Sequence, residues 1–124
     1  MTVQEYTKQM VNEFRERLRG WDISKFSEGL KGKLNDEEFM ECMSWIIVNL
    51  TKCESFLFDL GVAELECRRL LIDSREKNNV EAVKVINETL VLLKDIKNIV
   101  LSRKEYMEMV ATLLRSIRSN KPRV

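Results

Sequence analysis

The residues of this chain that could do chemistry are few and widely spaced. There is no histidine, which excludes Ser-His-Asp and Cys-His nucleophile systems and histidine-bearing zinc sites. The cysteines Cys42, Cys53 and Cys67 lie 11 and 14 residues apart, and neither spacing matches a zinc knuckle or a redox Cys-x-x-Cys motif. We therefore expect reduced thiols that act as small apolar groups in a core, with no metal and no cofactor.

Carboxylates gather in two places, at 36–38 and at Glu64 and Glu66. Paired carboxylates can serve as general acid and base, but helix capping and a solvated helix face account for these groups equally well. Neither Gly-x-x-x-x-Gly-Lys nor Gly-x-Gly-x-x-Gly, whose backbones cradle phosphate, occurs in the chain. The sequence therefore predicts a binding protein rather than an enzyme.

The elements that must position these residues are predicted to be helices. Residues 62–121 contain neither glycine nor proline, and apolar residues recur there every three or four positions. Ser102 with Glu105 has the spacing of a capping box, so the last part of the chain either starts a new helix there or continues the preceding one. We predict helices over 3–19, 36–77, 80–101 and 103–118, with a short helix near 22–30.

The segment 36–77 is the longest predicted helix. Asn35 and Glu38 form a capping-box pair at its start, and Gly61 could bend it in the middle. At 1.5 Å per residue it is roughly 60 Å long, which exceeds the diameter of a small globule. Its apolar stripe alternates spacings of three and four residues as in a coiled coil, which predicts a homo-oligomer. The predicted interface residues are Phe39, Met43, Ile46, Leu50, Leu57 and Leu60.

The predicted fold class is all-α, an elongated helical bundle with one long helix and coiled-coil-like packing. The 124 residues are expected to form a single helical domain. Residues 1–35 form its N-terminal helix and an irregular segment, 36–118 its helical core, and 119–124 a tail.

Composition sets the remaining limits. The formal net charge of +1 gives no overall field that attracts nucleic acid or a membrane surface. The longest apolar runs, such as 45–48, are far shorter than the ~18 residues that cross a bilayer. The first residues show no secretion signal. We therefore expect a cytoplasmic protein, in the host-cell cytoplasm if the source is viral, that makes no membrane contact.

Two segments are rich in basic residues. Segment 15–33 interleaves them with Trp21 and Phe26, which fits either a nucleic-acid stacking surface or two core side chains. The C-terminal end can either contact phosphates or complement a helix dipole. Its basic residues are Arg115, Arg118, Lys121 and Arg123.

The second half of the chain carries a family resemblance. Met43-Ser44-Trp45-Ile46 opens a long helix that runs to the charged stretch Glu64-Leu65-Glu66-Cys67-Arg68-Arg69. The segment 106–119 then ends in Ile117-Arg118-Ser119. Over roughly residues 40–120 this layout resembles the small helical recombination-mediator proteins of T-even-type phages. The family's basic contact segment is not clearly reproduced, since 51–77 carries only five basic residues.

The resemblance implies a function. Such mediators form ring-shaped oligomers that bind single-stranded DNA and load a recombinase. Here DNA contact would fall to Arg115, Arg118, Lys121 and Arg123, helped by Arg68 and Arg69. The alternative is a regulator or adaptor that docks a protein partner through an apolar helical face and makes no nucleic-acid contact.

Overall fold

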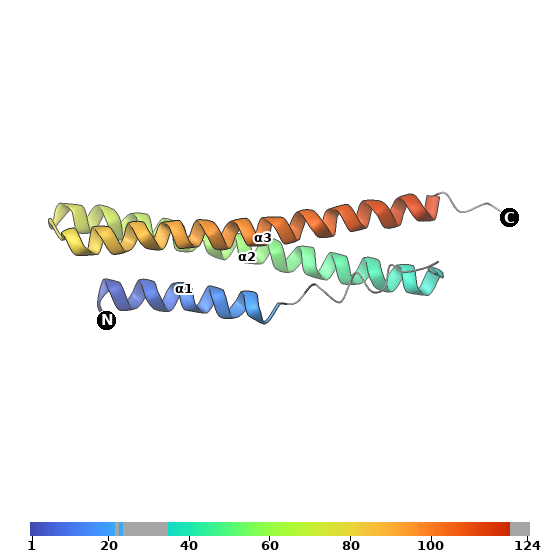
Figure 1. The fold of residues 1–124 in the computed structure, drawn as a ribbon, viewed down its shortest axis with the longest axis horizontal. Helices are drawn as coiled ribbons and strands as arrows, with labels where there is room; N and C mark the ends of the chain where they lie inside the picture. The colour runs from blue at the N-terminus through green and yellow to red at the C-terminus, as the bar shows by residue number, and fades with distance from the viewer. Residues whose placement is uncertain (22, 24–34, 120–124) are drawn as a thin grey trace.

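The structure, a computed structural model, describes residues 1–21, 23 and 35–119, with side chains up to residue 116. Within these ranges the chain forms three helices and no strand: α1 (Val3–Arg19), α2 (Asp36–Glu76) and α3 (Val80–Ser119). The helices α2 and α3 form a long antiparallel hairpin, and α1 lies beside the half of it that is nearer the hairpin turn (Figure 1). The predicted all-α bundle is confirmed.

Local signals in the sequence set the ends of α1 and α2. The Thr2 hydroxyl accepts a hydrogen bond from the Glu5 amide, and Gly20 follows the last residue of α1. The Asn35 side chain likewise accepts from the Glu38 amide at 2.8 Å, which is the predicted cap of α2. Because these caps depend on residues three positions apart, the predicted ranges 3–19 and 36–77 agree with the structure to within one residue.

The hairpin turn between α2 and α3 is made by two asparagines. Asn78 has a φ of 55°, a left-handed conformation that asparagine tolerates better than most residues. The Asn79 side chain accepts a hydrogen bond from the Ala82 amide and so caps α3. This turn sends α3 back along the full length of α2.

One predicted boundary is wrong, because α3 is a single helix from Val80 to Ser119 rather than two helices at 80–101 and 103–118. The Ser102 hydroxyl donates to the Asn98 carbonyl at 3.0 Å, the usual bond of a serine inside a helix. It therefore caps nothing. The short helix predicted near 22–30 lies outside the described residues, apart from Ile23, which is not in a helix.

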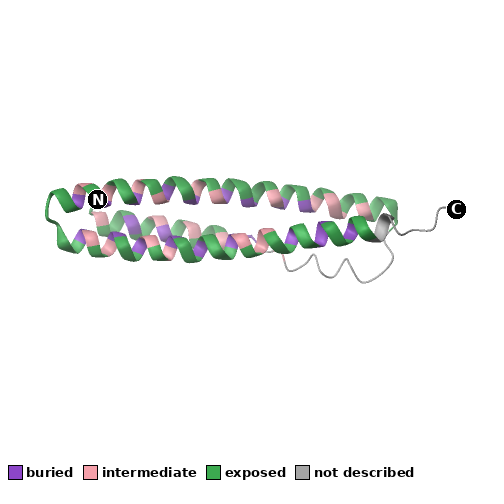
Figure 2. Ribbon diagram, turned by 90° about the horizontal axis from the view of Figure 1, so that it is seen from above, coloured by how far each residue is buried: buried purple, intermediate pink, exposed green. Residues whose placement is uncertain are grey.

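The core is widest where all three helices meet. Phe56 of α2 is 2% exposed and lies against Phe14 of α1 and Trp21, with ring centroids 5.7 and 6.3 Å away. The Trp21 indole donates to the Asn49 side chain at 2.8 Å, and Arg103 of α3 donates to the Trp21 carbonyl at 2.7 Å. Trp21 is thus a core side chain. Buried positions recur along the helices (Figure 2).

Candidate interaction surfaces

The helix α2 carries a second apolar stripe, on the side that faces away from the core. Six large apolar side chains there are each more than half exposed. They lie 7, 11, 4, 3 and 7 residues apart, and at 3.6 residues per turn all of these spacings return to one side of a helix. We call this surface the outer face of α2. Its members are Met40, Ile47, Phe58, Val62, Leu65 and Ile72.

This arrangement is unusual for the outside of a small bundle. A helix that packs one stripe into a core normally presents charged residues on the opposite side. Two phenylalanines show the contrast, because Phe56 is 2% exposed and Phe58, only two positions away, is 71% exposed. A row of exposed apolar side chains of this kind marks a binding site for another protein more often than a solvated surface.

The residues predicted to form an oligomer interface lie elsewhere. Ile46 and Leu60 are 1% and 3% exposed inside the chain's own core. Phe39, Met43, Leu50 and Leu57 are half-buried and pack against that core. The reason is that α3, which is nearly as long as α2, runs back beside it and packs against this stripe (Figure 1). The length of α2 alone therefore gives no reason for a second chain.

Among the residues that the structure describes, the basic side chains predicted to contact DNA are not brought together. Arg68 pairs with Glu64 at 3.0 Å and Arg69 with Glu66 at 2.6 Å, each within α2. The hydrogen bond from Arg69 lowers the pKa of Glu66, so that pair stays ionised. Both arginines therefore carry compensated charges.

Of the other predicted DNA contacts, only the Arg115 side chain belongs to the described part of the chain. Arg115 is exposed in the last part of α3. Lys94 of α3 lines the same groove as Arg68. Arg115 lies 21 residues beyond Lys94, which corresponds to roughly 30 Å of helix, so Arg115 is far from Arg68. The Arg118 side chain, Lys121 and Arg123 are outside the described part of the chain.

Sequence reasoning missed a small basic group at the groove between α2 and α3. Arg68 borders this groove together with Lys94 and Lys97 of α3, and Gly61 forms part of its floor. The groove has a volume of about 420 Å³. The two lysines are three positions apart and so share one side of α3, a spacing that could have been noticed in the sequence.

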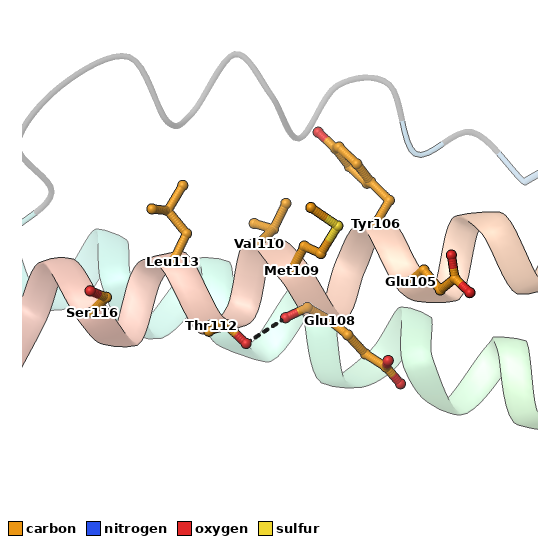
Figure 3. A pocket seen from close by; sticks show the side chains of 8 residues that line it. All are labelled: Glu105, Tyr106, Glu108, Met109, Val110, Thr112, Leu113 and Ser116. Atoms are coloured by element: carbon orange, nitrogen blue, oxygen red, sulfur yellow. Dashed lines mark hydrogen bonds between the residues drawn. The ribbon is translucent and has the colours of Figure 1, made fainter.

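A second exposed apolar surface lies on the C-terminal half of α3. Tyr106, Met109 and Leu113 are 37%, 71% and 52% exposed, and with the buried Val110 they line an open hollow of about 890 Å³. Figure 3 shows these four side chains projecting from the same side of the helix, while the Thr112 hydroxyl donates to the Glu108 carbonyl within it. The hollow is short compared with the outer face of α2.

The cysteines behave largely as the sequence predicts. Cys53 and Cys67 are 0% exposed, and the Cys67 thiol lies 3.8 Å from the Met10 sulfur. Cys42 is half-buried. Burial raises the pKa of the Cys53 thiol to about 11, although Lys104 and Arg103 oppose the shift. Burial also raises the pKa of the other two thiols. None of the three is therefore poised as a nucleophile.

This pKa shift predicts a loss of stability in alkaline solution. The folded Cys53 thiol keeps its proton up to about pH 11, whereas an unperturbed thiol loses it near 9.0. The contribution of Cys53 to stability is therefore complete below pH 9.0 and is lost as the pH rises toward about 11. Urea unfolding across this range should show a steeper decline for the unmodified protein than for Cys53→Ala. Parallel declines would show that Cys53 does not titrate in this way.

Two further kinds of site are missing from the ranges that the structure covers. No group of three or more cysteine or carboxylate side chains there could hold a metal ion. None of the helices in those ranges has a stretch that is both long and apolar enough to cross a membrane.

No protein-family model, no curated protein and no solved structure matches this chain. The resemblance to phage recombination mediators therefore stays a prediction, and the function has to be argued from the surfaces described above.

Proposed function

We propose that this chain is a non-enzymatic helical binding protein that holds another protein chain on the outer face of α2. The observation that carries the proposal is the row of six exposed apolar side chains between Met40 and Ile72. The row covers most of α2 and lies opposite the core, so the helix is apolar on two sides. A helix that is apolar on two sides is stable in water when both sides are covered.

The outer face of α2 can supply a large part of the free energy needed for binding. Burying a large apolar side chain completely contributes about 1.5–3 kcal/mol, so six that are about half exposed can add roughly 5–9 kcal/mol per chain. Association costs an estimated ~4–15 kcal/mol in lost translation and rotation. A partner that brings a matching apolar stripe supplies the remainder. The straight, narrow shape of the face fits a partner helix better than a loop or a strand.

This function predicts that one charge on the outer face abolishes partner binding. Leu65 is 70% exposed, so Leu65→Asp should leave the helices folded while it places an unpaired carboxylate in the contact. Tagged protein would be used to capture partners from the native cell, with and without nuclease. We expect Leu65→Asp to reduce the captured protein at least about tenfold, which corresponds to ~1.4 kcal/mol.

Met109→Asp is the matched control, because Met109 is 71% exposed but lies in the hollow on α3. If Met109→Asp loses the partner and Leu65→Asp keeps it, the binding surface is the hollow and not the outer face of α2. Circular dichroism of both variants would verify that the helices remain folded.

A second proposal is a recombination mediator that associates with single-stranded DNA and a recombinase in the cytoplasm. The observation in its favour is that Lys94 and Lys97 line one groove, together with the Glu64–Arg68 pair. Binding should then weaken steeply with salt and ignore base sequence. An oligonucleotide mobility shift at low salt that is lost in Lys94→Glu/Lys97→Glu would support it. The absence of a mobility shift at low salt would reject this second proposal. It would also be rejected if the protein captured a partner that nuclease treatment does not remove and bound no DNA.

A further inference from the structure

Gly61 lies level with the middle of the outer face of α2, at the edge where it also lines the groove toward α3. A Cβ atom added at this position would meet nothing within 4 Å, and the residue is exposed in mid-helix. An interior glycine destabilises a helix relative to alanine. What a surface glycine does allow is the close approach of another backbone. Gly61 is flanked on the outer face by Phe58 and Leu65, so the feature points to a helix packed across this place.

Two charged residues interrupt the apolar stripe at equal distances from its centre. Glu54 lies 7 residues before Gly61, and Arg69 lies 7 residues after Val62. Among the described residues Glu54 has no ion-pair partner. Arg69 is held by Glu66 but its side chain is still 66% exposed. The two charges are thus placed symmetrically and have opposite signs.

This symmetry selects between the ways in which a second copy of the chain could cover the face. In a parallel pair each Glu54 would face its own counterpart and each Arg69 would do the same, so both contacts would be repulsive. In an antiparallel pair with Phe58 opposite Leu65, each Glu54 faces the partner's Arg69. In that register Gly61 of one copy stands level with Val62 of the other, so a position without a side chain lies beside the two-fold axis.

The neighbouring antiparallel registers are less favourable. With Leu65 opposite its own counterpart, Glu54 would face Glu76, which places like charges together. With Phe58 opposite its own counterpart, Glu54 would face Val62 and leave its charge uncompensated in an apolar contact. Of these three registers, the one with Phe58 opposite Leu65 is the one that pairs Glu54 with Arg69 and the two large apolar side chains with each other. It places Ile47 opposite Glu76 at the end of the helix.

We propose that the chain on the outer face of α2 is a second copy of this protein, bound antiparallel about a two-fold axis that passes between Gly61 and Val62. The inference rests on the proposed function, because it names the partner for the same face. It also makes the assembly a closed dimer. A two-fold contact buries the same patch on both copies and leaves no second outer face to extend into a filament.

A charge exchange tests the register. Glu54→Lys and Arg69→Glu should each weaken self-association roughly tenfold at low salt, because each converts two ion pairs into two like-charge contacts. The double variant Glu54→Lys/Arg69→Glu restores both pairs with reversed polarity and should return to within about threefold of the unmodified protein. Lys84→Glu, an exposed change on α3, is the matched control and should have no effect. Sedimentation equilibrium would measure all five proteins.

Gly61 gives a second, independent test. Gly61→Ala should raise the thermal unfolding midpoint of the dilute monomer, because alanine is the better helix former. The same change should weaken self-association, because the added methyl groups separate the two backbones. A variant that is both more stable and more weakly associated would support the contact at Gly61. A variant that is more stable and associates as strongly as before would overturn it.

Two results separate this inference from the proposed function. If the unmodified protein sediments as a 14.6 kDa monomer at tens of micromolar, or if the double charge variant does not recover, a second copy is not the occupant. The proposed function survives that result if Leu65→Asp still loses a captured protein. It fails with the inference if Leu65→Asp and the unmodified protein capture the same partners.

Discussion

Replacing Phe56 with alanine is expected to lower the free energy of unfolding by about 3–5 kcal/mol. Phe56 is 2% exposed at the point where the three described helices meet, and its ring lies beneath the Arg17 guanidinium at 4.4 Å. Its neighbours are Phe14 of α1 and Trp21, and Trp21 is held by hydrogen bonds from its indole to Asn49 and from Arg103 to its carbonyl. They cannot close the cavity without moving a helix, so most of the cost should appear.

Urea or thermal unfolding of Phe56→Ala measures this loss, and Phe58→Ala is its matched control. Phe58 is 71% exposed, so its truncation should change the stability of the dilute monomer by no more than about 0.5 kcal/mol. Equal losses for the two variants would mean that the inner and outer faces of α2 have been assigned wrongly.

The largest expected effect on binding comes from Phe58→Asp. In a two-fold contact this single change places two carboxylates in an apolar seam, one from each copy. Self-association should fall at least about a hundredfold, or ~2.7 kcal/mol, while the helix content stays the same. Sedimentation velocity over a range of protein concentrations gives the dissociation constant.

An unchanged dissociation constant in Phe58→Asp would exclude the outer face of α2 as the self-association surface. Met109→Asp tests whether any exposed apolar side chain gives the same loss. Because Met109 has the same 71% exposure on a different helix, its change should leave the dissociation constant unaltered.

The ends of the first two helices could be predicted from the sequence because their signals are local. Asn35 and Glu38 are enough to predict the start of α2, and the Glu38 amide donates the expected hydrogen bond to the Asn35 side chain. Ser102 has an equally good capping spacing, yet α3 runs through it unbroken. A capping residue acts only where the helix ends, and nothing near Ser102 interrupts the apolar periodicity.

The choice between the two faces of α2 could not be made from the sequence. The stripe through Ile46 and Leu60 and the stripe through Phe58 and Leu65 both have helical spacing. Which one is covered depends on the direction in which the turn at Asn78 sends α3, and this is tertiary information. The signal for the outer face was nevertheless present. A helix with apolar residues on two opposite sides has one more apolar stripe than its own core requires.

The central claim, that the outer face of α2 is covered by another protein chain in the cell, can be tested with one introduced thiol on this face and a second, reference thiol on α3. Val62→Cys places a thiol of similar size on the face at a site that is 52% exposed in the isolated chain. Lys84→Cys places a reference thiol on α3. The alkylation rates of both would be compared in cells and in dilute purified protein. We predict that the rate at residue 62, relative to that at residue 84, is several-fold lower in cells than in dilute protein. Equal ratios in the two conditions would contradict the account.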